Sequence, residues 1–478
     1  MTSASEPDDG QALATAIADG RVSALAAMEA SLARAEELRG LGAIAWMDAG
    51  LGRAGAQAWD ERGRERDGGP AGRPAFAGVP FLMKDLGSAA AGLAMRFGTA
   101  QPPVTAAQDS DLAARLRAAG LVPYGLTTVP ELGLALSSEP PAGPVARNPF
   151  DPARTPGGSS GGAAAAVASG IVALAHATDA GGSIRVPAAC CGLVGLKPTR
   201  GATPGGPDFG NHLAGLASEF AVTRSLRDAA ALLDGVAGRG RGPAPDPALG
   251  GPAVAAIERE PPPLRVVLLE DAGPDMPIAP EIVEAVRHAG RIFAQAGHAV
   301  GILRSSDLLP HAGVAGDVFG AVVAVNIARL FGPTPEGLSP VACAFARQGA
   351  EMPATRLQEL ELAAVRIAHA LWRLFEAADL IVGPMLSGPP LPIGSFPVDH
   401  GDPGLHLRRM AAFAPYAALA NVAGVPALSV PHGRSGGLPL AVQLLGPMGS
   451  DVRLLQAARI LQRAVPWRFG KTVAGLPA

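Results

Sequence analysis

The chain has 478 residues, of which 48% are apolar and 17% are charged. That balance is typical of a compact globular protein and excludes an extensively disordered one. The formal net charge is −3 and no stripe of Lys and Arg runs along the chain, so we expect no nucleic-acid partner. The three cysteines, Cys190, Cys191 and Cys343, are too few for a disulfide framework and lack the usual spacing of a zinc site.

The sequence favours a soluble protein of the cytoplasm. The first ten residues are polar and acidic, without the features of a secretory signal. The long apolar stretch at 163–177 is mostly alanine and is too short to span a bilayer, so we expect no membrane partner. Independence from disulfides fits a reducing compartment.

Strand and helix signals alternate along the chain. The first half predicts a helix over 23–40 with Ser23 as N-cap, a strand over 76–85, a helix over 110–120, a strand over 121–126, a helix over 163–169 and a strand over 171–176. The second half predicts a strand over 264–270, a helix over 280–297, a strand over 298–303, a helix from a Thr355–Gln358 capping box to about 377, and strands over 380–384 and 427–431. This alternation favours an α/β sheet with helices on its faces.

The segment 155–199 carries the strongest functional signal. It reads TPGGSSGGAAAAVASGIVALAHATDAGGSIRVPAACCGLVGLKPT, with glycine pairs beside serines. A phosphate-binding loop would need a following Gly-Lys-Ser/Thr, which is absent. Glycine-rich loops can also serve close packing alone. The third interpretation is nucleophilic catalysis, in which backbone N–H groups of Ala180, Gly181, Gly182 and Ser183 form an oxyanion hole beside the Ser183 hydroxyl.

A serine nucleophile needs a base. Histidine is the usual base, but Ser183 is not in a Gly-X-Ser-X-Gly elbow. His176 lies on a predicted strand, where a structural role is expected, and His432 lies in a predicted turn at a strand end. Lys84 is the alternative base, because it ends the apolar segment GVPFLMKD and burial would lower its pKa from about 10.4. The competing interpretation is that Lys84 only neutralises Asp85.

These motifs resemble those of the amidase signature hydrolases. GGSSGGAAAAVASG and TDAGGSIRVPAACCGLVGLKPT closely resemble the amidase signature, and GVPFLMKD resembles the lysine-bearing strand of that family. The resemblance continues through PELGLALSSEPPAGPVARNPFD to NVAGVPALSVP and GLPLAVQLLG, over nearly the whole chain. It implies a large mixed, twisted β-sheet flanked by helices on both faces.

The spread of these motifs favours a single domain over 1–478. Its signature core would occupy about 70–235, and a segment rich in Pro and Gly at 238–263 would be a surface connection. The C-terminal part, 264–478, would then complete the sheet and the substrate pocket.

The resemblance also implies a Ser–cisSer–Lys triad. Ser183 is then the nucleophile, Lys84 the base, and Ser159, which follows a cis peptide bond after Gly158, the bridging serine. The implied reaction is amide hydrolysis through a covalent acyl-enzyme on Ser183, with release of a carboxylate and of ammonia or an amine.

The same resemblance gives expectations for the rest of the site. Asp179 and Arg185 are expected to pair and to support the loop that carries the nucleophile. The mechanism needs no metal or other cofactor. The expected partner is a small-molecule amide, linear or small cyclic.

Departures from the family pattern concern the substrate. Many members have Asn where this chain has Thr128, and ELGLALSSEP does not resemble the A subunits of aminoacyl-tRNA amidotransferases. The branch that contains 6-aminohexanoate cyclic dimer hydrolase and related bacterial amidases is more similar. A stand-alone amidase is therefore favoured. An amidase-type subunit of a larger complex is the alternative, and a homodimer is left open.

The substrate pocket is expected from three stretches, 132–140, 208–218 and 305–410. Phe319, Phe331 and Met385 are candidates to line it, although taken singly each is expected in the hydrophobic core rather than in the pocket.

Overall fold

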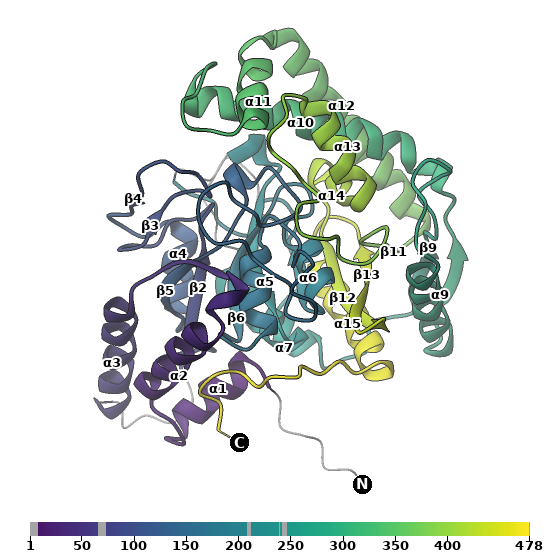
Figure 1. The fold of residues 1–478 in the computed structure, drawn as a ribbon. Helices are drawn as coiled ribbons and strands as arrows, with labels where there is room; N and C mark the ends of the chain where they lie inside the picture. Colours follow the sequence, from purple (N-terminus) through teal and green to yellow (C-terminus); the bar gives the residue numbers. More distant parts are fainter. Residues whose placement is uncertain (1–7, 66–72, 208–211, 239, 241–245, 478) are drawn as a thin grey trace.

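The computed structural model describes residues 8–65, 73–207, 212–238, 240 and 246–477. Within these residues an 11-stranded sheet runs through the centre of the molecule in the order β1-β5-β2-β6-β8-β7-β12-β13-β11-β9-β10 (Figure 1). The strands are β1 Ile44–Met47, β2 Pro80–Lys84, β5 Val122–Thr127, β6 Leu174–Asp179, β7 Val194–Lys197, β8 Ser218–Thr223, β9 Arg265–Leu268, β10 Ala299–Ile302, β11 Leu380–Pro384, β12 Ala427–Ser435 and β13 Leu438–Leu445. A separate ribbon pairs β3 Ala94–Met95 with β4 Val104–Thr105.

The sheet is mixed. β2 is parallel to both β5 and β6, and β9 is parallel to both β10 and β11. The neighbouring pairs β6–β8, β8–β7, β7–β12 and β12–β13 between them are antiparallel. β2, β5, β6, β7 and β8 are buried along their whole length, as expected where elements cover both faces of a sheet. The α/β fold with a large mixed sheet is therefore confirmed.

Helices cover the sheet and add an outer layer, formed by α10 to α13 at the top of Figure 1. The predicted N-cap Ser23 is observed, because its side chain accepts a hydrogen bond from the first turn of α2, and Ser110 caps α4 in the same way. The helices are α1 Gly10–Ala18, α2 Ala24–Glu37, α3 Ala49–Glu65, α4 Asp111–Ala118, α5 Gly161–Ala168, α6 Arg185–Cys191, α7 Leu226–Val236, α8 Ala253–Ala256, α9 Pro280–Gln295, α10 Leu309–Phe331, α11 Pro340–Ala350, α12 Ala354–Ala377, α13 Pro403–Phe413, α14 Ala417–Ala423 and α15 Asp451–Ala464.

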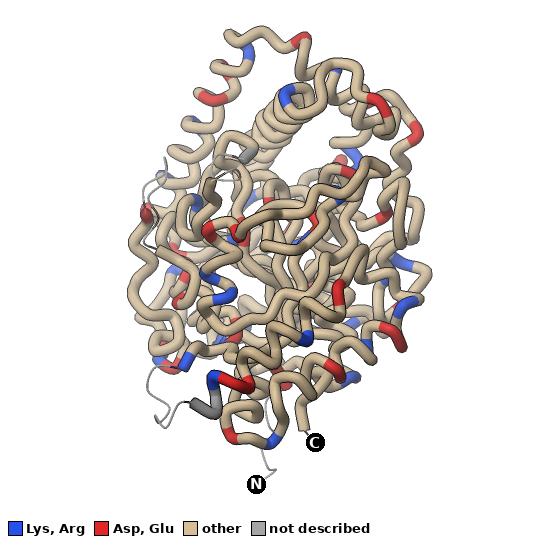
Figure 2. The backbone as a smooth tube through the Cα atoms, turned by 90° about the vertical axis from the view of Figure 1, so that its left-hand side faces the viewer, with Lys and Arg blue, Asp and Glu red and all other residues tan. Residues whose placement is uncertain are grey.

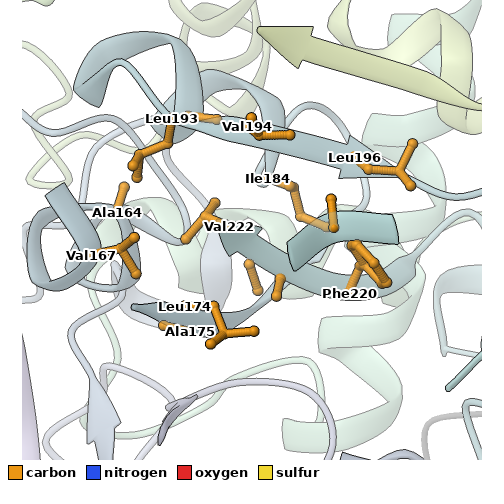
Figure 3. Close-up of a cluster of buried hydrophobic side chains, with 14 of the residues drawn as sticks. Ala164, Val167, Leu174, Ala175, Ile184, Leu193, Val194, Leu196, Phe220 and Val222 are labelled. Carbon is orange, nitrogen blue, oxygen red and sulfur yellow. The ribbon is translucent and has the colours of Figure 1, made fainter. Parts of the chain in front are cut away.

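The alanine-rich helix α5 lies in the middle of the core. All eight of its residues are buried, and Figure 3 shows its Ala164 and Val167 beside the apolar side chains of β6, β7 and β8. Small residues are required here, since a Cβ on Gly162 would lie 2.4 Å from the backbone nitrogen of Thr128. This close approach places the residue that precedes the helix, Ser160, and its neighbour Ser159 deep inside the molecule.

Three local predictions are wrong. α12 begins at Ala354 after Pro353, so Thr355 is already inside the first turn and no side chain caps this helix. β6 starts at Leu174, three residues later than predicted, because the end of α5 and a turn at Gly170 (φ 77°) occupy the preceding residues. His432 lies inside β12, beside a register shift, and not in a turn.

One apolar helix was not anticipated. Among the described residues α10 alone is long and apolar enough to cross a membrane by length and composition, and 44% of its most apolar window is buried. Core helices of soluble proteins meet the same criterion, so the finding is weak as an indication of a membrane. α10 packs against α11, α12 and α14, and basic and acidic residues are interspersed along the chain in Figure 2.

Candidate active site

Lys84 ends the buried strand β2 and is fully buried. Its Nζ donates hydrogen bonds to Ser159 Oγ at 2.8 Å and to Thr178 Oγ1 at 2.7 Å. Burial lowers the pKa of Lys84 to about 7, although the negative charges of Asp179 and Glu219 oppose this shift. Burial thus favours the neutral amine of Lys84, which is the form that can accept a proton.

Asp85 is not the partner of Lys84. Its carboxylate instead accepts hydrogen bonds from the backbone N–H groups of Arg96, at 2.7 Å, and Gly98, at 3.2 Å. Asp85 thus serves the loop that follows β2, and the interpretation of Lys84 as its neutralising cation is wrong.

Ser159 lies in the glycine-rich loop before α5, with 2% of its surface exposed. The Gly158–Ser159 peptide bond is cis, as the family resemblance implied. The neighbouring glycines leave room for a close approach of backbone, because a Cβ on Gly158 would lie 2.1 Å from the carbonyl oxygen of Ser137. The Ser159 carbonyl oxygen also accepts a hydrogen bond from Ser138 Oγ at 3.2 Å.

Ser183 lies in the loop between β6 and α6, two residues before the helix starts at Arg185. It is 7% exposed and lines the same cavity as Ser159, Thr178 and Ala180. Ser159 and Ser183, 24 residues apart in the sequence, therefore line one cavity, and Lys84, 75 residues before Ser159, is hydrogen-bonded to Ser159.

Asp179 and Arg185 form a fully buried ion pair beneath this loop, with Nε and Nη2 of Arg185 each 2.9 Å from a carboxylate oxygen. Burial acts to raise the pKa of Asp179, but the Arg185 guanidinium and the loop N–H groups outweigh it and hold that pKa well below its usual range. The Arg185 guanidinium also donates to Gln443 Oε1 and Asn421 Oδ1, each at 2.7 Å, and to the Ala417 carbonyl oxygen at 2.8 Å.

The Asp179 carboxylate changes the expected oxyanion hole. Asp179 accepts hydrogen bonds from the N–H groups of Gly182, at 2.7 Å, and Ile184, at 3.1 Å. The expectation that Gly182 offers its N–H to a substrate is thus corrected, because that N–H is held by the carboxylate. Ala180, Gly181 and Ser183 keep N–H groups that have no hydrogen-bond acceptor among the described residues.

Thr178 and the pair His176–Glu219 were not assigned to the site from the sequence. His176 is fully buried and contacts the Lys84 backbone as well as Glu219. The available signal was the strand period of two, which puts residues 176 and 178 on the same face of β6. Glu219 carries no comparable signal, because only the pairing of β8 with β6 brings it here.

The cavity in front of the serines has a volume of about 710 Å³. One wall comes from α10 and is mostly apolar, with Phe319, Val323, Ile327 and Phe331 beside the polar Asn326 and Arg329. Met385 does not line the cavity. It is buried behind the loop, with its Cε 3.8 Å from where a Gly182 Cβ would be.

The stretches expected to form the pocket contribute unequally. Leu132, Gly133 and Leu134 line the cavity, as do Leu213 and Ala217, whereas 208–211 lie outside the described residues. Within the part of the chain that the structure describes, no group of three His, Cys, Asp or Glu side chains could hold a metal ion.

Comparisons with known proteins show the family to which the chain belongs. The amidase family model matches residues 26–455. The 6-aminohexanoate-cyclic-dimer hydrolase of Pseudomonas sp. (strain NK87) is 35% identical over 428 residues, which cover 82% of this chain and 84% of the relative. A solved structure of a 6-aminohexanoate cyclic dimer hydrolase superimposes with a TM-score of 0.87 at 30% identity, over 97% of this chain and 98% of the other.

A second solved structure is also similar to this chain. A bacterial aryl acylamidase of the amidase signature family superimposes with a TM-score of 0.83 at 25% identity, over 95% of this chain and 96% of that one. The chain belongs to the amidase signature family of hydrolases, and its fold is the fold of that family.

Proposed function

We propose that the protein is a stand-alone amidase that hydrolyses a carboxylic amide C–N bond with Ser183 as nucleophile, Ser159 as bridging serine and Lys84 as base. The observation that carries the proposal is the 2.8 Å hydrogen bond between Lys84 Nζ and Ser159 Oγ. A buried lysine with a pKa of about 7 is suited to accept a proton at neutral pH.

The reaction starts with a neutral Lys84. Lys84 Nζ takes the proton of Ser159 Oγ, which takes the proton of Ser183 Oγ as the latter attacks the substrate carbonyl. The proton returns along the same path to the nitrogen of the leaving amine, and the C–N bond breaks. Water then attacks the acyl-enzyme and its proton passes to the Ser159–Lys84 pair. The bond between the acyl carbon and Ser183 Oγ breaks, the proton returns through Ser159 to Ser183 Oγ, and the acid leaves.

The carbonyl oxygen gains negative charge during the attack. The N–H groups of Ala180, Gly181 and Ser183 are the donors for this oxyanion, since the Gly182 N–H is held by Asp179. The proposed role of the Asp179–Arg185 pair is to hold this loop rigid. Removal of one oxyanion donor typically costs about 10²–10³-fold in kcat, so the rigidity of this loop matters for rate.

The cavity favours a small-molecule amide with an uncharged, apolar substituent. Arg329 is the sole ionisable side chain among the described cavity-lining residues, and apolar side chains form most of the wall. The similar enzymes named above act, by their names, on a cyclic amide or on aryl acylamides, both of which suit such a wall. The chain covers nearly the full length of these enzymes, which favours a stand-alone enzyme, and we place it in the cytoplasm.

The test is a panel of short aliphatic, aryl and cyclic amides with wild type and Ser183→Ala. Loss of the nucleophile is expected to lower kcat by roughly 10³–10⁶-fold. Ser169→Ala is the matched control, because this buried serine bonds the Ala165 carbonyl at the far end of α5. Hydrolysis of every amide at equal rates by wild type and Ser183→Ala would overturn the proposal.

A further inference from the structure

A buried carboxylate lies behind Lys84 and has no part in the proposed proton transfer. Glu219 is 2% exposed and belongs to β8, which pairs antiparallel with β6 so that Glu219 is opposite Thr178. Its carboxylate accepts hydrogen bonds from Ser88 N at 2.7 Å, from Ser88 Oγ at 2.9 Å and from His176 Nε2 at 2.9 Å. Three hydrogen-bond donors therefore surround this one carboxylate.

His176 connects this carboxylate to Lys84. The backbone N–H of Lys84 points to His176 Nδ1 at 3.3 Å. A backbone N–H can only donate, so Nδ1 has to be the acceptor and the ring proton belongs on Nε2, facing Glu219. The imidazole in this arrangement is neutral. Its Nδ1 accepts the Lys84 N–H in place of a backbone carbonyl of β6, since the ladder between β2 and β6 has a single pair, Leu82 with Ala175.

The charges around Lys84 are unevenly compensated. Asp179, on β6, is paired with Arg185, and Asp85, on the strand of Lys84 itself, is held by backbone N–H groups. Ser159 and Thr178 touch the amine and are uncharged, and Thr127 is opposite Lys84 in β5.

Glu219 differs from the other acids near Lys84. In the described part of the chain its one ion-pair contact is His176, whose ring is neutral in this geometry. The negative charge of Glu219 therefore stays uncancelled and acts on the amine of Lys84, opposing the effect of burial.

We propose that Glu219 is a positioning residue for Lys84: through His176 it anchors the backbone of the base, and together with Asp179 it supplies buried negative charge that keeps the amine basic enough to accept a proton. The proposal rests on the function proposed for Lys84. Burial alone would weaken the base, and the charge of Glu219 restores part of its affinity for protons.

The chain offers a direct measurement, because it has only three lysines, Lys84, Lys197 and Lys471. NMR of protein labelled with [ε-¹³C]lysine follows each amine through a pH titration, and Lys84→Met assigns the signal. Glu219→Gln keeps a side chain of the same shape and removes the charge. We expect the Lys84 midpoint to move down by about one pH unit, a tenfold change in proton affinity, and the acid limb of kcat/KM to move with it.

Lys197 is the internal control. It is also buried, with a pKa lowered by burial to about 7, and the charged groups that act on it are Arg185, Asp179, Asp451 and Arg200. Its midpoint is expected to stay in place in Glu219→Gln. Glu219→Asp retains the charge, so its Lys84 midpoint is expected to lie closer to wild type than to the Gln variant.

A merely structural role for Glu219 predicts a different result. Activity would fall in Glu219→Gln while the Lys84 midpoint stayed where it is in wild type, and that outcome overturns the proposal. Glu219→Met removes the same charge and replaces the Gln variant if the latter does not fold. If the proposed function is wrong, wild type and Ser183→Ala would instead show the same turnover, or none, whatever the lysine titration shows.

Discussion

The proposed reaction centre at Lys84 and Ser159 and the α10 wall of the cavity adjoin each other but are held in different ways. Lys84 and Ser159 are buried and fixed by short hydrogen bonds. Phe319 is only partly buried and is held by apolar contacts, with its ring 3.1 Å from where a Gly181 Cβ would be. Proton transfer depends on distances of tenths of an ångström, whereas an apolar wall needs area and shape. We therefore expect changes in the centre to affect kcat and changes in the wall to affect KM.

The largest effect is expected for Lys84→Met. Removal of the base should lower kcat/KM by about 10³-fold, in the range of general acid–base catalysis. Thermal stability should stay the same or rise, since the buried amine no longer has to be desolvated. Paired measurements of amide turnover and of Tm check this. A variant that kept wild-type turnover would remove Lys84 from the mechanism.

The pH dependence of the wild type follows from the same group. Below a pH of about 7 Lys84 becomes protonated, so kcat/KM is expected to fall tenfold for each further pH unit. The free energy of unfolding also depends on pH. Between pH values of about 7 and 10.5 Lys84 binds a proton in the unfolded chain but not in the folded one, so the free energy of unfolding rises with pH. A pH–rate profile and denaturant titrations at several pH values test both. A rate that is flat from pH 5 to 8 contradicts a neutral-lysine base.

The wall is probed by Phe319→Ala. The side chain contributes apolar area to bound substrate, and its loss is expected to raise KM for an apolar amide by about tenfold with a smaller change in kcat. Val314→Ala is the control, because Val314 is on the same helix, 39% exposed and outside the cavity lining. A fall confined to kcat would mean that the wall helps to position the reacting groups.

The smallest effect is expected for Thr178→Val. This change deletes one of the two side-chain partners of Lys84 Nζ and keeps the shape of the side chain. One hydrogen bond is worth about 1 kcal/mol, so kcat should fall by roughly fivefold while KM is unchanged. Steady-state kinetics measure kcat and KM separately. A change in KM alone would mean that Thr178 contributes to substrate binding, like the α10 wall, and not to the reaction.

The two regions also differ in how far the sequence predicts them. Lys84, Ser159 and Ser183 are recognisable because each lies in a continuous motif whose glycines serve close backbone approaches, such as that of Gly158 to Ser137. The hydrogen bond from the Gly182 N–H to Asp179 could not be predicted from the motif, because it depends on the conformation of the loop. The loop is local, so most of it could be anticipated from neighbouring residues.

Long-range packing is what the sequence does not specify. Glu219 reaches His176 only through the pairing of β6 with β8. Phe319 reaches Gly181 only because α10 is placed over the loop. Both are common residue types without a motif, and their roles depend on contacts between segments that are 43 and more than 130 residues apart. The strands β2, β5, β6, β11 and β12 were predicted because buried apolar runs are a local signal, whereas β7, β8 and β13 of the same sheet were not predicted.

The most direct test of the central claim is covalent labelling of the nucleophile. Wild-type protein is treated with a serine-directed phosphonate, and the adduct is located by peptide mass spectrometry. We expect one adduct on Ser183, no adduct in Ser183→Ala, and labelling slowed about 10³-fold in Lys84→Met. An adduct on another serine, or none at all in active wild-type protein, would contradict Ser183 as the nucleophile.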